Sequence, residues 1–201
     1  KKKGIHCFGF DPAPEAIEYG KGQGLENLVS AGLDRMDVFN ERFDVVTLFN
    51  VLEHVAEPGK VIAEIRADVL KPGGLIIVDV PNEFSPLQVA ARKLHKLGEW
   101  WVVPPGHLNY FSKDTLCSLL TGIGFDIRLA ESSFPLEMFL LSGRNYVTNP
   151  ALGKACHRER VAFETNLRKF GGGAVLRGIY QALAQLNVGR QVVVFAVRDA
   201  S

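Results

Sequence analysis

The sequence FDVVTLFNVLEHV at residues 43–55 and the sequence LKPGGLIIV at residues 70–78 decide the fold of this 201-residue chain. Phe43–Leu48 and Leu75–Val80 are nearly continuous apolar runs rich in β-branched residues. Such runs are typical of parallel strands that are covered on both faces. Between them, apolar residues recur at helical spacing over Pro58–Leu70, and we expect the turn Lys71–Gly74 to end that helix.

The flanking segments continue the alternation of strands and helices. Ile5–Phe10 predicts a short buried strand that ends at Asp11, and Pro14 favours a helix start directly after it. Farther along, Asp114–Ile123 predicts a helix and Phe125–Ala130 a strand. The pattern as a whole predicts a Rossmann-like, doubly wound α/β fold, with a mostly parallel sheet and helices on both faces.

A different pattern begins after residue 135. Helical periodicity covers residues 136–146, 154–169 and 175–186, and a last strand is predicted over Gln191–Val197. We therefore expect a single domain over residues 1–201, with a helical insertion at 136–186 before the last strand. The richest expected loop is Pro81–Pro105.

The composition indicates an ordinary globular protein. Hydrophobic residues make up 47%, charged residues 22%, and the net charge is +1, which points to no nucleic acid or other charged polymer as a partner. No apolar run reaches the roughly 18 residues that a membrane span needs. The scattered cysteines Cys7, Cys117 and Cys156 indicate reduced thiols and a cytoplasmic protein. The oligomeric state is left open.

Polar side chains follow two of the predicted strands. Asp11 could accept both hydroxyl hydrogens of a ribose held across the strand ends, although an Asp before Pro12 can equally cap the next helix. Asn50–His54 places a second polar cluster just beyond the strand Phe43–Leu48. Open α/β sheets bind their ligands at this edge.

Taken together, these motifs resemble the class I S-adenosylmethionine-dependent methyltransferases, in the branch similar to the ubiquinone-biosynthesis O-methyltransferases. The resemblance rests on the order FDVV, LEHV, LKPGG and PN within residues 43–82, with GFDP at residues 9–12 and HLNYFS at residues 107–112. It covers roughly Phe8–Glu131. It implies S-adenosylmethionine as the cofactor.

The resemblance also implies which residues contact that cofactor. They are Asp11, Pro12, Leu33, Asp34, Asn50, Val51 and Leu52. In this assignment Asp11 holds the ribose hydroxyls, Asp34 lies beside the adenine, and Asn50 approaches the methionine part. Asp37 is a competing choice for the position of Asp34.

Methyl transfer to a hydroxyl or phenol needs a base, and histidine suits that role because its ordinary pKa lies near neutral pH. His54 and His107 are the two candidates. The alternatives are a helix-start residue for His54 and a loop anchor for His107, because many methyltransferases act mainly by proximity. Glu53 with His54 could instead bind a divalent metal, but two adjacent ligands make a thin site, so we predict none.

Two further groups of residues have a structural interpretation beside the functional one. The aromatic side chains that could wall a substrate pocket or simply pack in the core are Trp100, Trp101, Tyr110 and Phe111. The charged segment Lys154–Arg160 could receive an anion, but a solvated helix face is the interpretation that we prefer.

A glycine-rich turn after a first strand, which the resemblance implies, does not occur before Ile5. The glycines at residues 20–24 and 171–173 follow predicted helices, so they indicate helix ends. We expect a strand between those ending at Asp11 and Leu48, and a gap in the sheet without it. Our expectation is that the native chain carries at least one strand and helix before Lys1.

The sequence thus predicts an S-adenosylmethionine-dependent methyltransferase that acts on a small molecule, with oxygen as the favoured acceptor atom. A catalytically silent methyltransferase-like binding or scaffold protein is the alternative. An NAD-dependent dehydrogenase shares the acidic strand end but explains neither LKPGG nor LEHV. The acceptor itself is not predicted.

Overall fold

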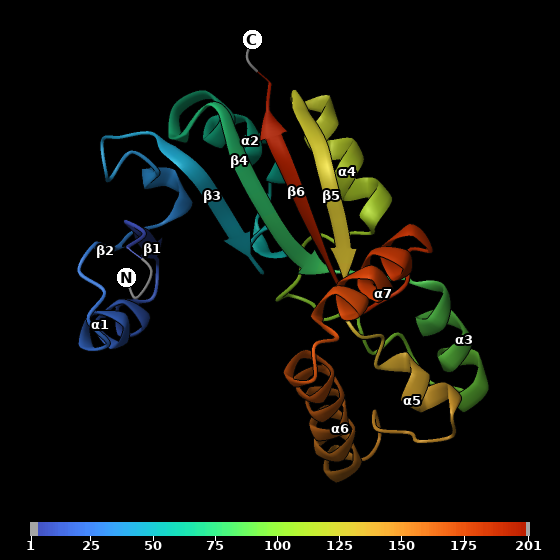
Figure 1. Ribbon diagram of the computed structural model, residues 1–201. Coiled ribbons are helices and arrows are strands. Elements are labelled where there is room, and N and C mark those ends of the chain that lie inside the picture. The colour runs from blue at the N-terminus through green and yellow to red at the C-terminus, as the bar shows by residue number, and fades with distance from the viewer. Residues whose placement is uncertain (1–3, 200–201) are drawn as a thin grey trace.

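The strands of the protein form two sheets, which the computed structural model describes over residues 4–199 (Figure 1). The strands are β1 (Gly9–Asp11), β2 (Leu28–Ser30), β3 (Phe43–Phe49), β4 (Leu70–Pro81), β5 (Phe125–Ser132) and β6 (Gln191–Arg198). The helices are α1 (Pro14–Gly22), α2 (Pro58–Glu64), α3 (Pro86–His95), α4 (Lys113–Gly122), α5 (Glu137–Leu141), α6 (Pro150–Lys169) and α7 (Gly173–Gln185). Short 3₁₀ turns cover Leu33–Arg35 and Leu52–His54, and a π-helical turn covers Ile65–Val69.

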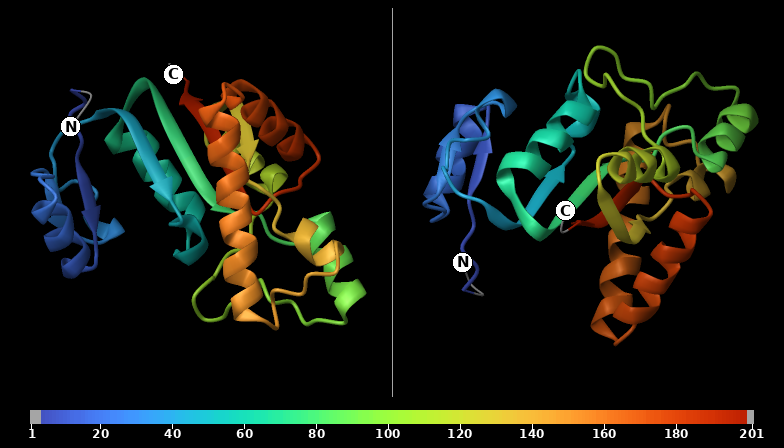
Figure 2. Two further views of the ribbon diagram at one scale, coloured as in Figure 1. Left: turned by 60° about the horizontal axis from the view of Figure 1, so that its bottom comes forward. Right: turned by 90° about the horizontal axis from the view of Figure 1, so that it is seen from above.

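Strand β6 is the one that runs against its neighbours. In the four-stranded sheet the order is β3-β4-β6-β5, with β3 parallel to β4 and β6 antiparallel to both β4 and β5. The second sheet is the parallel pair β1 and β2. Both views of Figure 2 show this pair and α1 set to one side of the larger sheet. The predicted Rossmann-like α/β class is confirmed, and the sheet is divided where we expected a gap.

Most of the buried core packs against the four-stranded sheet. Strands β4 and β6 alternate buried and half-buried residues, as a period of two requires. Helices α2 and α4 bury their apolar stripes against these strands, with Ile62, Leu116 and Leu120 fully buried. Helix α7 contacts β5, and Leu176 and Tyr180 are its largest buried side chains. None of the described helices is long and apolar enough to cross a membrane.

The turn Lys71–Gly74 lies inside a strand, so our prediction that it separates a helix from a strand is wrong. Helix α2 gives way to the π turn at Ile65, and β4 begins at Leu70 instead of Leu75. Between two ladder pairs β3 advances from Phe43 to Val45 while β4 advances from Leu70 to Leu75. The extra residues bulge out of the ladder, which the positive φ of 71° at Gly73 permits.

Helix α3 lies within the segment that we expected to be a loop, Pro81–Pro105, and takes up 10 of its residues. Its start is a capping box: the Ser85 hydroxyl accepts from the Gln88 backbone N–H, and the Gln88 side chain accepts from the Ser85 N–H. Pro86 stands at the first helical position, where it costs no hydrogen bond. The sequence Ser-Pro-Leu-Gln could therefore have predicted this helix.

The insertion before β6 contains the three helices that we predicted, with shifted bounds. Helix α5 ends at Leu141 instead of Tyr146, since Gly143 adopts φ 85° and turns the chain away. Helix α6 begins at Pro150, because Asn149 accepts a hydrogen bond from the Leu152 N–H. Most charged side chains of Lys154–Arg160 are exposed, in agreement with the solvated-face interpretation.

Candidate functional site

A cavity of about 1060 Å³ lies between the two sheets. Residues of β1 and β3 line it from both sides, and the rings of Phe8, Phe39 and Phe43 meet there at centroid distances of 5.2 to 6.0 Å. The lining includes six residues that we predicted for the site: Asp11, Pro12, Leu33, Asn50, Val51 and His54. Three other predicted residues, Asp34, Leu52 and His107, are not among its lining.

Asp11 stands at the carboxyl end of β1 and is exposed. Its Oδ1 accepts a hydrogen bond of 2.8 Å from the Ala13 N–H, so the residue shapes the turn that leads into α1. The side chain also borders the cavity. The two interpretations of this residue are therefore compatible, because a carboxylate accepts several hydrogen bonds at once.

Asn50 directs the chain from β3 into the turn Leu52–His54. Its φ of 52° lies in the left-handed region, which asparagine tolerates better than most residues. The Asn50 N–H donates to the Asp79 carbonyl at 2.9 Å, and its side-chain oxygen accepts from Gln191 Nε2 at 2.9 Å. Strands β4 and β6 thus hold this residue at the rim of the cavity.

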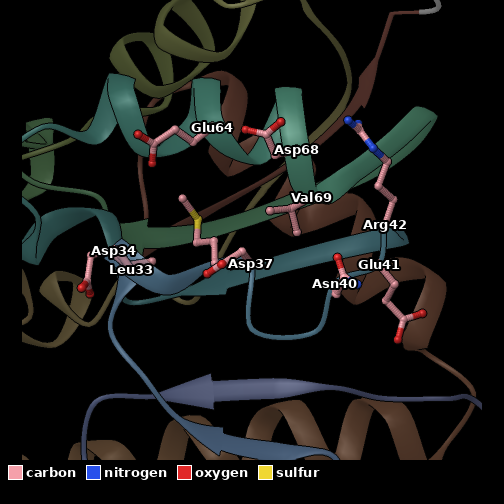
Figure 3. A pocket seen from close by; sticks show the side chains of 10 residues that line it. Leu33, Asp34, Asp37, Asn40, Glu41, Arg42, Glu64, Asp68 and Val69 are labelled. Carbon is pink, nitrogen blue, oxygen red and sulfur yellow. The ribbon is translucent and has the colours of Figure 1, made fainter.

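Leu33 lines both this cavity and a second one of about 500 Å³, shown in Figure 3. Asp34 and its competitor Asp37 line the second cavity alone, together with Glu64 and Asp68. Gly32 leaves room for the Asp34 carboxylate, since a Cβ there would stand 2.5 Å from Oδ1. The structure thus places both acidic candidates for the adenine contact outside the larger cavity.

Leu52 is fully buried and belongs to the hydrophobic core. Leu52 is the first residue of the turn Leu52–His54 and is not among the residues that line the larger cavity. Val51 packs partly against the same core but also lines the cavity. Of these two predicted cofactor contacts, only Val51 therefore has a side chain at the cavity.

The two candidate bases lie side by side, with ring centroids 5.0 Å apart. His54 Nδ1 lies 2.6 Å from the Gly106 carbonyl oxygen, which can only accept, so Nδ1 carries the hydrogen. In the neutral ring the lone pair then sits on Nε2, which is 3.8 Å from Glu53 Oε1. The His107 Nδ1 is buried and has no hydrogen-bond partner.

His107 joins the adjacent pair of possible metal ligands, Glu53 and His54, to make a group of three. Among the described residues, potential ligand atoms of Glu53, His54 and His107 all lie within 4.8 Å of one another. Glu53 is buried and its Oε2 has no hydrogen-bond partner. This donor set of one carboxylate and two imidazoles is chemically suited to a divalent metal ion.

Three carboxyl groups outside the turn are buried or half-buried: Asp79 of β4, Glu83 and Glu137 of α5. Burial, and next the charge of Glu53, raises the pKa of Asp79 to about 6. Burial likewise raises the pKa values of Glu83 and Glu137, against the lowering effect of Arg190. We did not predict these acids, although Asp79 interrupts the apolar run of β4 and could have been noticed for that reason.

Some of the aromatic side chains near the site are buried, and others are exposed. Trp101 and Phe111 are buried, and Phe111 belongs to the core, as the packing interpretation predicts. Phe84, which we did not predict, is 49% exposed with its ring 5.6 Å from that of Trp101 and 6.0 Å from that of Tyr110. Sequence spacing gives no sign of this contact.

The strand order, the reversed β6 and a cavity that runs along β1 and β3 and reaches past the carboxyl ends of both strands define a Rossmann-like α/β domain of the kind that binds nucleotide-derived cofactors. A family model described as "Methyltransferase domain" matches residues 1–130. The chain belongs to this methyltransferase family, whose cofactor is S-adenosylmethionine.

Relatives and solved structures agree with this assignment. The chain is 26% identical over 140 residues to the ubiquinone biosynthesis O-methyltransferase of Aeromonas salmonicida, which covers 63% of this chain and 56% of that protein. Its counterpart from a Caulobacter species is 37% identical over 133 residues, covering 63% and 48%. The chain thus spans about half the length of these relatives.

Two solved structures share the fold. A methyltransferase from Archaeoglobus fulgidus gives a TM-score of 0.57 at 15% identity, covering 98% of this chain and 78% of that one. The [4+2]-cyclase SpnF gives 0.54 at 19%, covering 98% and 68%. Because the fold is shared with a cyclase, the fold alone does not define the reaction.

Proposed function

We propose that the protein transfers a methyl group from S-adenosylmethionine to an oxygen atom of a small molecule. The observation that carries the proposal is the cavity onto which Asp11, Asn50 and His54 converge from two sheets. The two relatives named above are O-methyltransferases by name, which supports oxygen as the acceptor. The free thiols of Cys7, Cys117 and Cys156 support a place of action in the cytoplasm.

The donor chemistry of the cavity fits the cofactor. The exposed Asp11 carboxylate can accept from ribose hydroxyls while keeping its contact with Ala13, and Pro12 and Leu33 offer apolar surface for the adenosine. Asn50 and Val51 border the same cavity beyond β3, where we propose that they contact the methionine part. The proposed role of Leu52 is to support this contact from the core.

When bound, S-adenosylmethionine supplies a methyl group on a positively charged sulfur. Nε2 of His54 would accept the proton that the acceptor hydroxyl gives up when it takes this methyl group. The Gly106 carbonyl holds the other ring nitrogen in its protonated form throughout. We propose His107 as the second base candidate, packed against His54.

Calorimetry with S-adenosylmethionine, on the protein at its full native length, tests the proposal. Asp11→Ala should weaken binding about 10- to 100-fold, because a hydrogen bond to a charged group contributes roughly 1.5 to 3 kcal/mol. Asp11→Asn keeps an oxygen for the Ala13 contact and should lose less. Asp126→Ala, which removes an exposed carboxylate paired with Arg128 on β5, is the control and should bind normally.

Absence of binding by the unmodified protein would contradict the proposal and support the scaffold alternative. Binding without methyl transfer to any member of a panel of phenols, sugars and short hydroxy acids would separate the cofactor assignment from the activity. Once an acceptor is identified, His54→Gln should lower kcat about 100-fold or more, since general-base catalysis typically raises the rate 10²- to 10⁴-fold.

A further inference from the structure

We propose that Asn109 is a positioning residue, which holds His54 in place by locking the turn Leu52–His54 to the loop 106–109. This inference rests on the proposed function, because it assigns to Asn109 an effect on methyl transfer through His54. Asn109 lies 55 positions beyond His54 in the chain and is half-buried. It does not line the larger cavity, so its effect is indirect.

The Asn109 amide spans the turn from one end to the other. Its Nδ2 donates to the Leu52 carbonyl at 3.1 Å and to the Val55 carbonyl at 2.5 Å. These two carbonyls flank His54 on both sides. An NH₂ group has two hydrogens to donate, so a single side chain satisfies two acceptors that the short 3₁₀ turn leaves outside its own hydrogen bonding.

The backbone of the loop adds a second set of contacts. The N–H groups of Leu108 and Asn109 both donate to the Glu53 carbonyl, at 2.7 and 3.1 Å. The remaining contact is the one between His54 Nδ1 and the Gly106 carbonyl at 2.6 Å. Turn and loop therefore form one hydrogen-bonded unit, and the loop supplies the acceptor that sets which nitrogen of His54 is protonated.

The consequence is that the loop 106–109 cannot shift without moving His54. If the Asn109 amide is removed, the carbonyls of Leu52 and Val55 lose their donors and the turn can rotate. The Glu53 carbonyl still accepts from the Leu108 and Asn109 N–H groups, but the residues on both sides of it are no longer held, and we expect the His54 ring to shift relative to the Gly106 carbonyl and the His107 ring. A displacement of about 1 Å at a reacting group can cost on the order of 100-fold in rate.

The test compares Asn109→Ala with Asn109→Gln and with Asn149→Ala. Asn149 also uses its side chain to hold backbone, since it accepts from the Leu152 N–H at the start of α6, but it lies far along the chain from the turn. The first readout is the nuclear Overhauser cross-peak between the ring protons of His54 and His107, which the centroid distance of 5.0 Å predicts. It requires no substrate.

We expect Asn109→Ala to lose this cross-peak, Asn109→Gln to restore it in part, and Asn149→Ala to retain it at a similar loss of thermal stability. For methyl transfer, Asn109→Ala should lower kcat about 10- to 100-fold and leave the dissociation constant of S-adenosylmethionine within twofold. An unchanged cross-peak in Asn109→Ala would overturn the inference. So would equal losses of kcat in Asn109→Ala and Asn149→Ala.

Failure of the proposed function has a different signature. If the unmodified protein neither binds S-adenosylmethionine nor methylates an acceptor, the enzymatic proposal fails, but the cross-peak still decides whether Asn109 positions His54. If Asn109→Ala does not fold, the comparison passes to Asn109→Gln, which keeps the NH₂ group on a side chain one methylene longer. A Gln variant in which the cross-peak and kcat fall together supports the inference, and one in which kcat falls while the cross-peak stays normal contradicts it.

Discussion

The two-stranded part of the molecule, residues 4–42, differs from the four-stranded part, residues 43–199, in how much it buries. Ile17 is the one buried hydrophobic residue among the described residues before Phe43, whereas the main core cluster lies wholly between Leu48 and Ala196. Strands β1 and β2 are three residues long and pair only with each other. A pair of this size is marginal by itself, since stable sheets usually need three or more strands.

This difference matters because the candidate site draws on both parts. Asp11, Pro12 and Leu33 come from the two-stranded part, and Asn50, Val51 and His54 come from the four-stranded part. The proposed catalytic residue, His54, therefore belongs to the part that has a packed core. The proposed ribose-binding residue, Asp11, belongs to the part that buries little. We infer that cofactor binding stabilises the two-stranded part more than the rest, because ligands stabilise the states they bind.

The largest expected effect is on the core beneath the turn. Leu52→Ala should lower the free energy of unfolding by about 3 kcal/mol, as large-to-small changes at fully buried sites commonly do. Ile17→Ala should instead lower global stability by less than about 1 kcal/mol, because α1 can open locally without the main core. Urea denaturation measures the first quantity, and hydrogen exchange of the α1 amides shows the second.

Equal losses of global stability for Leu52→Ala and Ile17→Ala would show that the two parts unfold together. A selective loss of protection in α1 for Ile17→Ala would show that the two-stranded part opens by itself. Adding S-adenosylmethionine to the protein at its full native length should then restore protection in α1 more than in α4.

The parts of the fold that could be predicted are those with strong periodicity. Phe43–Leu48 was expected as a central strand covered on both faces, and it does form a strand, β3, as an unbroken apolar run favours. The predicted position is wrong, because β3 lies at the edge of the four-stranded sheet and four of its seven residues are exposed. The turn Lys71–Gly74 was misplaced, because Pro-Gly-Gly suits a bulge as well as a loop between elements. Strand β2 was missed, because its three residues, two half-buried and one exposed, are too few to show a period.

In the candidate site, the residues that could be predicted from the sequence are those that follow the ends of strands. Asp11, Asn50 and His54 were chosen as residues beyond strand ends, and all three line one cavity. The contact between Asn109 and the turn could not be predicted, since it joins segments more than 50 residues apart. The same is true of the pairing of His54 with His107, which depends on how the loop folds back onto β3.

A smaller effect distinguishes the acids at two strand ends, Asp79 of β4 and Asp11 of β1. Burial and Glu53 raise the pKa of Asp79 from 3.8 to about 6, so the folded state favours the protonated form. The stabilisation of the folded state by protonated Asp79 is complete below about pH 3.8 and is lost as the pH rises through 6.

Asp79→Asn should accordingly raise the free energy of unfolding by about 1 kcal/mol at pH 7.5, a value reduced from the full shift because the group is only half-buried, and much less at pH 4. Asp11→Asn, at an exposed strand end, should give no such gain. Urea unfolding at the two pH values measures both. A pH-independent effect of Asp79→Asn would show that the charge of Asp79 is not what destabilises this strand end.

The smallest effect concerns the end of α1, where the two-stranded part can be strengthened without touching the core. Gly22 is the last residue of the helix, and a Cβ there would meet nothing within 4 Å, so Gly22→Ala should stabilise α1 by about 0.5 kcal/mol through its helix propensity. Gly24 has equal space but adopts φ 82°, so Gly24→Ala should destabilise by about 1 kcal/mol. Hydrogen exchange of the α1 amides should report both changes, while the urea midpoint of the four-stranded part stays constant. A shift of that midpoint by Gly22→Ala would mean that α1 belongs to the main cooperative unit. The two-stranded part would then not open separately from the four-stranded part.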